Sequence, residues 1–298
     1  MELPAYHPFR SAKAKEQYLA LYDLQAKQWP IPSETRMVET SYGQTFVRLS
    51  GPVDAQPLVL LPGFQANSLL WIPNIAALSA RYKTCAVDNI YDIGRSIYIR
   101  PLKTPGDYVN WLDELFTALA LREPIHLMGI SYGGWLTCQY ALRYPQRLGK
   151  IVLLAPAAVL PLRLEFMMRG LLGLVHPRFF RDFFHWVLEG GVYHEEAPSQ
   201  RLMEEPIDEM LLALRCFRLK AEGPPKVLAD NELQRLRVPA LYLVGEHEKI
   251  YPAQKAVQRL NRVAPWITTK IVPRAGHSLN ATQAELVNKK VLDFLKQP

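Results

Sequence analysis

The sequence predicts an α/β protein built on a mainly parallel, doubly wound sheet of about eight strands with an inserted helical cap. Short apolar runs alternate with helical patterns, which is typical of parallel sheets. The runs are almost continuously apolar, as expected for strands that helices cover on both faces. The alternation stops after Pro156 and resumes at Val238. We therefore assign residues 1–156 and 236–298 to the core and residues 157–235 to the cap.

Eight segments are expected to form the sheet. Residues 36–42 and 45–50 flank Gly43 and Gln44 and predict a hairpin. The other six segments are apolar runs that predict buried strands: residues 57–61, 83–87, 125–130, 150–155, 240–245 and 268–272.

Several helices have recognisable starts. A helix is expected over residues 11–28, before a proline-rich turn. Thr104 suits an N-cap, and Asp107 places an acid near the positive end of the following helix. Thr282 and Glu285 have the spacing of a capping box and predict the start of the last helix.

Composition and charge narrow the function classes. The formal charge is +7, but Lys and Arg are spread along the chain without a run of five. This favours a solvated surface over a nucleic-acid interface. The longest apolar stretch, residues 151–162, is too short for a membrane span and is broken by prolines. Without an N-terminal apolar signal segment, we expect a cytoplasmic protein.

The cysteines and histidines predict no metal site. Cys85, Cys138 and Cys216 are an odd number without metal-type spacing, so we expect reduced, mostly buried thiols. The seven histidines are scattered and include no paired ligand motif.

One stretch places a serine among glycines where a predicted strand meets a predicted helix. Strand 125–130 leads directly into a helix over 132–143, so Ser131 lies at the turn between them. Gly129 and Gly133 stand two residues before and after it, where strand and helix approach too closely for a side chain. The G-x-S-x-G pattern predicts a nucleophile elbow, and the alternative is a glycine-rich turn with an idle serine.

The base that a serine nucleophile needs is expected to be a histidine held by a carboxylate. His277 follows the last predicted strand and precedes the last helix, where a base on this scaffold is expected. His126 lies within a strand, and three histidines lie in the insertion. His247 has a loop position but precedes Glu248, the opposite of the expected chain order.

Two glutamates are candidates for the acid. Glu246 and Glu248 follow strand 240–245, and no aspartate is present there. Glu248 stands three residues beyond Gly245, where the chain can turn back over the sheet edge. We therefore favour Glu248 as the acid and interpret Glu246 as a structural or solvent-facing carboxylate.

Two backbone amides are candidates for an oxyanion hole. One belongs to Tyr132, directly after the serine. The other belongs to Phe64 in the loop after strand 57–61, where Gly63 lets the backbone approach. By itself the second loop could be an ordinary turn.

With these residues in place, the sequence resembles the α/β-hydrolase superfamily. Over residues 58–156 and 238–297 it resembles bacterial carboxylesterases of the naproxen-esterase type. The matching stretches are LLPGFQANSLLWIPNIAALS, AVDNIYDIGRS, YVNWLDELFTALAL, MGISYGGWL, LVGEHEKIYP and AGHSLN. The resemblance implies the α/β-hydrolase fold, a serine hydrolase that needs no cofactor, and a glutamate as the acid. It also implies a structural role for Asp88, Asp92 and Arg95, beside the site.

The first interpretation is therefore hydrolysis of a small-molecule carboxylic ester through an acyl-enzyme on Ser131, with His277 as base and Glu248 as acid. A second interpretation keeps this triad for thioester, lactone or carbon–carbon bond hydrolysis, or for cofactor-free perhydrolysis. A third is a non-catalytic binding protein on the same fold, which predicts a damaged triad.

The insertion is rich in large apolar side chains: Met167, Met168, Leu171, Leu172, Phe179, Phe180, Phe183, Phe184 and Trp186. We expect most of them to pack within the insertion and some to roof an apolar pocket that favours an acyl or aryl group. The alternative for the lid aromatics is a contact in a homodimer.

Overall fold

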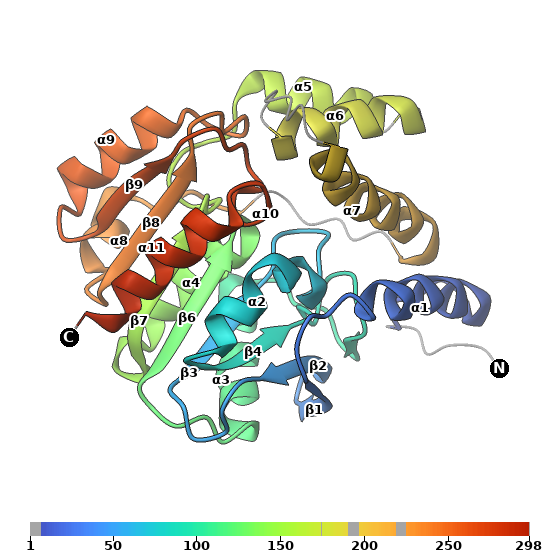
Figure 1. Ribbon diagram of the computed structural model, residues 1–298, viewed down its shortest axis with the longest axis horizontal. Coiled ribbons are helices and arrows are strands. Elements are labelled where there is room, and N and C mark those ends of the chain that lie inside the picture. Colours follow the sequence, from blue (N-terminus) through green and yellow to red (C-terminus); the bar gives the residue numbers. More distant parts are fainter. Residues whose placement is uncertain (1–6, 174, 190–196, 219–224, 298) are drawn as a thin grey trace.

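The computed structural model describes residues 7–173, 175–189, 197–218 and 225–297. Its core is a nine-stranded sheet, in which eight strands follow the order β1-β2-β4-β3-β6-β7-β8-β9 and β5 pairs with β2 (Figure 1). The strands are β1 (Glu34–Thr40), β2 (Gly43–Ser50), β3 (Pro57–Leu61), β4 (Lys83–Val87), β5 (Ile97–Tyr98), β6 (Ile125–Ile130), β7 (Leu148–Leu154), β8 (Ala240–Gly245) and β9 (Thr268–Val272). The predicted sheet of about eight strands is confirmed.

The sheet is antiparallel at one edge and parallel elsewhere. β1 pairs antiparallel with β2, and β2 pairs antiparallel with β4 and β5. All pairs from β4 through β9 are parallel. The carboxyl ends of β3, β6, β7, β8 and β9 therefore meet at one rim, where ligands bind in such sheets.

The hairpin turn differs from the prediction by two residues. Thr40 pairs with Gly43, so the turn lies between them rather than at Gly43 and Gln44. Gly43 instead lies against β5: its φ is +133°, and a Cβ there would lie 2.1 Å from the carbonyl oxygen of Ile97. The two-residue β5 was not predicted, because so short a strand carries no periodic pattern.

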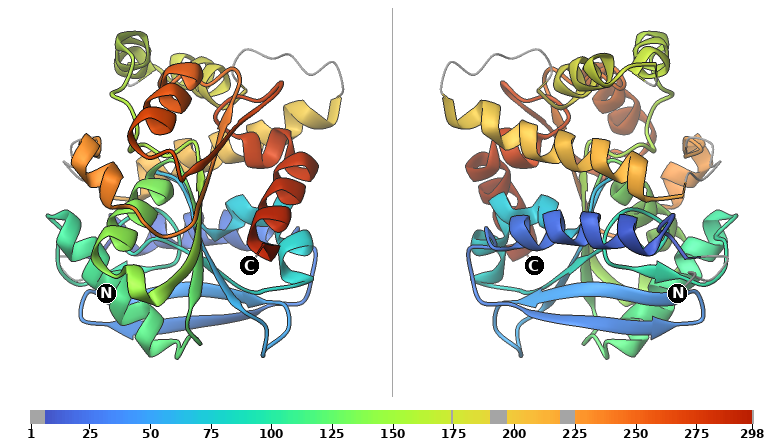
Figure 2. Two further views of the ribbon diagram at one scale, coloured as in Figure 1. Left: turned by 90° about the vertical axis from the view of Figure 1, so that its left-hand side faces the viewer. Right: turned by 90° about the vertical axis from the view of Figure 1, so that its right-hand side faces the viewer.

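Helices cover both faces of the sheet. The helical segments are α1 (Ala12–Ala26), η1 (Ser68–Trp71), α2 (Ile72–Ser79), α3 (Pro105–Ala118), α4 (Tyr132–Arg143), η2 (Pro145–Arg147), α5 (Leu164–Gly173), α6 (Pro177–Glu189), α7 (Ala197–Cys216), α8 (Asp230–Arg235), α9 (Ala253–Val263), α10 (Leu279–Thr282) and α11 (Ala284–Lys296). α2 and α11 lie on one face, and α3 and α4 lie on the other (Figure 2). Asn74 donates to Asn288 at 2.9 Å and joins α2 to α11.

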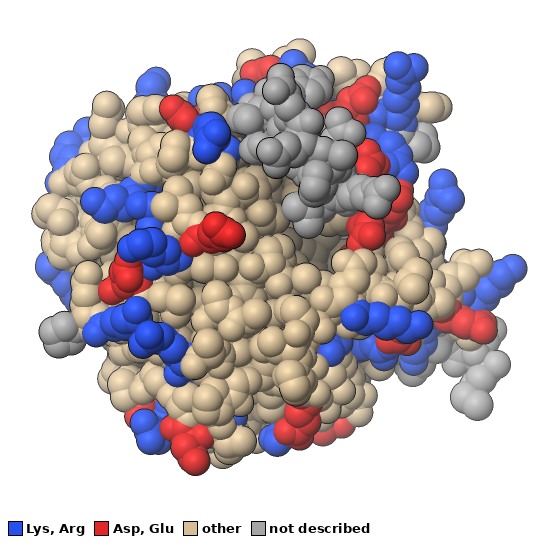
Figure 3. All heavy atoms as spheres, viewed as in Figure 1, with Lys and Arg blue, Asp and Glu red and all other residues tan. Residues whose placement is uncertain are grey.

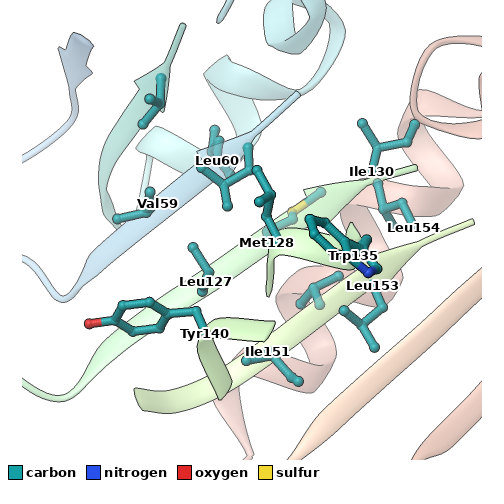
Figure 4. Packing of buried hydrophobic residues seen from close by; sticks show 14 of the residues in the cluster. Val59, Leu60, Leu127, Met128, Ile130, Trp135, Tyr140, Ile151, Leu153 and Leu154 are labelled. Carbon is teal, nitrogen blue, oxygen red and sulfur yellow. The ribbon is translucent and has the colours of Figure 1, made fainter. Parts of the chain in front are cut away.

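The core lies where the central strands meet α4. Side chains of β3, β6 and β7 pack with Trp135 and Tyr140 of α4 (Figure 4). Every residue of β3 and β6 is buried, which explains the continuous apolar runs of the sequence. This packing fixes the carboxyl ends of β3 and β6, from which the candidate site extends.

One predicted helix start is confirmed and one is wrong. Thr104 caps α3 in a capping box with Asp107. Thr282 does not cap the last helix: it ends the short α10, its hydroxyl donates to the Ser278 carbonyl at 3.1 Å, and Gln283 is the N-cap of α11. A capping residue needs an extended backbone, and the one-turn helix at Thr282 removes it.

The segment between β7 and β8 is helical where it is described. It contains α5, α6, α7 and α8, and no strand among its described residues; residues 174, 190–196 and 219–224 of the predicted cap lie outside them. α5, α6 and α7 lie together beyond one end of the sheet, and α7 runs beside α1 (Figures 1 and 2).

The expectation that most of the insertion's large apolar side chains pack within it is wrong. Five of the nine are exposed: Met167, Met168, Leu171, Leu172 and Phe179. α5 contacts α6 on one narrow side, where Gly170 and Gly173 lie against Phe183. The opposite side of α5 therefore has no packing partner among the described residues.

Candidate active site

Ser131 stands at the turn between β6 and α4 in a strained conformation. Its φ is 53° and its ψ is −115°, a combination that costs a residue other than glycine about 1–3 kcal/mol. Three backbone hydrogen bonds hold it there. Its amide donates to the Leu154 carbonyl at 2.8 Å, and its carbonyl accepts from Trp135 at 3.1 Å and from Ala157 at 3.0 Å. The predicted elbow geometry is thus present at the sheet rim.

The two elbow glycines are required by close backbone approach. A Cβ at Gly129 would lie 2.2 Å from the carbonyl oxygen of Gly133. A Cβ at Gly133 would lie 2.2 Å from the carbonyl oxygen of Leu61 and 2.5 Å from that of Pro62. The first contact sets the distance between strand and helix, and the second brings the β3 loop against the elbow.

We expect Gly133→Ala to lower the free energy of unfolding by about 3 kcal/mol or more, because its methyl group would overlap backbone atoms that cannot rotate away. Urea unfolding measures this loss. Gly106→Ala is the control, since a Cβ there meets only the Thr104 hydroxyl at 3.5 Å and alanine favours a helix. Equal stability of Gly133→Ala and Gly106→Ala would contradict the packing described for the elbow.

His277 and Glu248 form a buried pair. Glu248 Oε2 lies 2.7 Å from His277 Nδ1, and the side chains are 0% and 8% exposed. Glu248 Oε1 accepts from the Ile250 amide at 2.8 Å, so both carboxylate oxygens are occupied. When Nδ1 donates to the carboxylate, Nε2 is left as the acceptor nitrogen of the ring.

Glu246 lies apart from this pair. Its side chain is exposed, and it accepts from the Arg274 amide at 3.1 Å. The structure therefore places Glu248 beside His277 and places Glu246 at a neighbouring turn.

Backbone contacts between two loops bring Glu248 and His277 together. The amide of His247 donates to the Ala275 carbonyl at 2.9 Å. A Cβ at Gly245 would lie 2.2 Å from the carbonyl oxygen of Gly276. The loop after β8 therefore lies directly on the loop after β9.

The loop after β3 lies against the elbow. A Cβ at Gly63 would lie 3.4 Å from the Ser131 Cβ and 4.0 Å from its Oγ. The rings of Phe64 and Tyr132 meet edge to face at 6.5 Å between centroids. Tyr132 is the first residue of α4, so the two predicted amide donors belong to neighbouring residues beside Ser131.

Asp92 fixes the conformation of the β3 loop. The Gln65 amide donates to both carboxylate oxygens of Asp92, at 3.2 and 3.1 Å, and Gln65 has a φ of 53°. The Ile93 amide also donates to Asp92, at 2.8 Å. The carboxylate thus ties the chain next to Phe64 to the loop after β4.

Asp88 and Arg95 stabilise the same region. Asp88 is fully buried and accepts from the amides of Ser68 and Arg95, each at 2.8 Å, and from the Tyr22 hydroxyl at 3.3 Å. Burial raises the pKa of Asp88 above its ordinary value. The guanidinium of Arg95 lies over the Tyr22 ring, 4.9 Å from its centroid.

The end of α6 contacts the histidine loop, which the sequence did not indicate. The His277 amide donates to the Val187 carbonyl at 3.3 Å, and the Ser278 amide donates to the Leu188 carbonyl at 3.1 Å. Backbone carbonyls carry no side-chain signal, so no sequence pattern could have predicted this contact.

Within the described ranges, no group of three or more His, Cys, Asp and Glu residues could hold a metal ion. Cys85, Cys138 and Cys216 are buried free thiols, and burial raises the pKa of Cys85 and of Cys138 to about 12.

None of the described helices is long and apolar enough to cross a membrane. Basic and acidic side chains are interspersed on the face shown in Figure 3.

A strand–elbow–helix at the rim of this sheet, with a carboxylate–histidine pair on the loops after β8 and β9, defines the α/β-hydrolase fold. Residues 58–290 match the model of the alpha/beta hydrolase family. The chain belongs to this family.

Its relatives include carboxylesterases of Bacillus subtilis strain 168. Carboxylesterase YbfK is 34% identical over 287 residues, covering 96% of this chain and 96% of that protein. The uncharacterized carboxylesterase nap is 36% identical over 279 residues, covering 93% of this chain and 91% of that protein. The crystal structure of naproxen esterase from Bacillus subtilis superimposes with a TM-score of 0.86 at 35% identity, covering 96% of this chain and 99% of that one. The expected resemblance to bacterial carboxylesterases is confirmed.

Proposed function

We propose that this protein is a serine carboxylesterase that hydrolyses small esters with an apolar acyl or aryl group. Ser131 is the nucleophile, His277 the base and Glu248 the acid that orients His277. The amides of Phe64 and Tyr132 are the oxyanion donors. The observation that carries this proposal is the buried hydrogen bond of 2.7 Å between His277 and Glu248, on the rim where the elbow presents Ser131.

The reaction follows from these roles. Nε2 of His277 takes the hydroxyl proton as Ser131 Oγ attacks the ester carbonyl carbon. The carbonyl oxygen becomes an oxyanion, to which the amides of Phe64 and Tyr132 donate. His277 then gives its proton to the departing alkoxide, which leaves an acyl group on Ser131. Water, deprotonated by His277, attacks this acyl group and releases the acid.

The negative charge of Glu248 stabilises the imidazolium form of His277 and keeps the proton on Nδ1 between the two steps. Its burial strengthens this effect, because water does not screen a pair that is 8% exposed or less. The contacts from Val187 and Leu188 place the end of α6 over the histidine loop, where it helps to exclude water.

The same groups could act on thioesters, lactones or carbon–carbon bonds, or in perhydrolysis. The similarity to two carboxylesterases over nine-tenths of the chain favours esters. The homodimer stays a prediction, and the exposed lid aromatic Phe179 is a candidate contact for it.

A series of p-nitrophenyl esters tests the proposal. We expect turnover, with kcat/KM rising about fourfold for each added methylene from acetate to butyrate, because each buried methylene stabilises the transition-state complex by about 0.8 kcal/mol. A fluorophosphonate should inactivate the enzyme by binding one molecule of inhibitor to each protein chain. Failure to hydrolyse any ester in the series, together with turnover of a thioester or lactone, would overturn the ester assignment.

A further inference from the structure

A cavity of about 250 Å³ lies between the core and α7, beside the candidate active site. Its wall includes Gln65, the residue after Phe64, and Ser278, the residue after His277. One part of the wall is apolar and contains Leu69, Leu70, Ile72, Leu188, Met203 and Met210. The cavity therefore borders the two loops that carry Phe64 and His277.

The other part of the wall contains a buried carboxylate. Glu209 of α7 is 8% exposed, and its Oε1 accepts from the Tyr18 hydroxyl and from Asn67 Nδ2, both at 2.6 Å. Among the described residues, no hydrogen bond engages its Oε2. Burial is the main cause that raises the pKa of Glu209 to about 7. A carboxylate is a strong acceptor, so one oxygen of Glu209 is left available to a ligand.

A buried amide oxygen in the wall has no hydrogen-bond partner. Gln25 of α1 is 8% exposed, and its Oε1 makes no hydrogen bond. Buried polar atoms are almost always paired, so an acceptor of this kind points to a missing donor. The wall contains neither lysine nor arginine. The polar part of the cavity therefore offers acceptors and negative charge, which suits a cation and disfavours a carboxylate.

We propose that this cavity is a specificity subsite for a protonated amine at the end of an apolar substrate arm, with Glu209 as its acceptor. The inference rests on the proposed esterase function. The apolar wall contacts the arm, and the ammonium group donates to Glu209 and Gln25.

Glu209→Gln is the sharpest variant. The amide oxygen can still accept from Tyr18 and Asn67, while the oxygen that faces no donor becomes an amide nitrogen that repels a cation. Glu205→Gln is the matched control: it lies one turn earlier on α7, lines the same cavity and is exposed, so water already screens its charge.

Calorimetric titration of n-hexylammonium into the Ser131→Ala protein tests binding independently of turnover. We expect Glu209→Gln to weaken binding about 10- to 100-fold, as for a lost hydrogen bond to a charged group, and Glu205→Gln to change it less than about threefold. Binding that is absent, or equal in the Glu209→Gln protein, would overturn the subsite.

Paired substrates extend the test to catalysis. p-Nitrophenyl 6-aminohexanoate and p-nitrophenyl heptanoate have chains of the same length. The first ends in an ammonium group and the second in a methyl group. The ratio of kcat/KM for the aminohexanoate to kcat/KM for the heptanoate should fall about 10- to 100-fold in Glu209→Gln. The value of kcat/KM for the heptanoate should change little. An equal loss of kcat/KM on both esters would contradict the subsite, because it would mean that Glu209 only holds Asn67 in place. Failure of the wild-type enzyme on both would count against the esterase function instead.

The kcat/KM ratio should also rise with pH through about 7 in the wild type, because Glu209 becomes ionised there while the amine stays protonated. The groups that face Glu209 do not produce this change. Burial raises the pKa of Tyr18 well above its ordinary value, and Glu205 is exposed and is present in both proteins. Asp88 remains in both proteins, so a ratio that still changes through pH 7 in Glu209→Gln would contradict the assignment.

Discussion

Replacing Ser131 with alanine is expected to lower kcat for ester hydrolysis by about 10⁴-fold or more and to abolish covalent labelling by a fluorophosphonate. The side chain carries the only atom that the proposed mechanism joins to the acyl group. The oxyanion amides and substrate binding still act in the variant. Its rate of ester hydrolysis should therefore stay above the rate of the reaction in water. Steady-state kinetics and labelling followed by intact-protein mass spectrometry measure the two losses.

The Ser131→Ala variant should fold normally. Its backbone bonds to Leu154, Trp135 and Ala157 involve main-chain atoms only, so they persist in the variant. Ser41→Ala is a suitable control, since Ser41 lies in the exposed β1–β2 turn and contacts Glu114. Labelling of the Ser131→Ala protein at the wild-type rate would refute the nucleophile assignment, and the catalytic scheme would fail with it.

The second large effect is expected for Glu248→Gln, with kcat about 10³- to 10⁴-fold below the wild type. The Ile250 amide donates to one oxygen of Glu248 at 2.8 Å, so the glutamine carbonyl must take that position. The glutamine nitrogen then faces His277 Nδ1 and donates to it. The histidine proton then lies on Nε2, and a protonated Nε2 can no longer accept the proton of Ser131.

Glu246→Gln is the control for this effect, because the two carboxylates lie two residues apart on one loop. Glu246 is exposed and accepts from the Arg274 amide, a bond that glutamine can preserve. We expect its kcat to stay within about threefold of the wild type, since exposed groups away from the site have small effects. A larger loss in Glu246→Gln than in Glu248→Gln would reverse the assignment of the acid.

The individual elements of the core could be predicted from the sequence because their signals are local. The continuous apolar runs of β3, β6 and β8 follow from burial on both faces, which the hydrophobic pattern records directly. The elbow was predictable for the same reason. Gly129 and Gly133 lie within two residues of Ser131, and the contact that excludes a Cβ forms between the strand and the helix that they join.

The roles of Glu246 and Glu248 were only partly predictable. Both follow the same strand, and the sequence favoured one of them only through its distance from Gly245. The choice depends on how the loop after β8 lies on the loop after β9, through the contacts of His247 and Gly245 with Ala275 and Gly276. Those contacts join segments that are about 30 residues apart, and no local pattern encodes them.

The sequence by itself determined eight strands of the sheet and the elbow, because each depends on neighbouring residues. Only the tertiary structure showed that no described residue covers the apolar side of α5 and that Glu209 meets Tyr18 and Asn67 beside a cavity. These three residues lie on α7, on α1 and in the loop after β3. Their contact depends on how α7 packs on the core, and packing between distant segments follows from the shape and burial of whole surfaces.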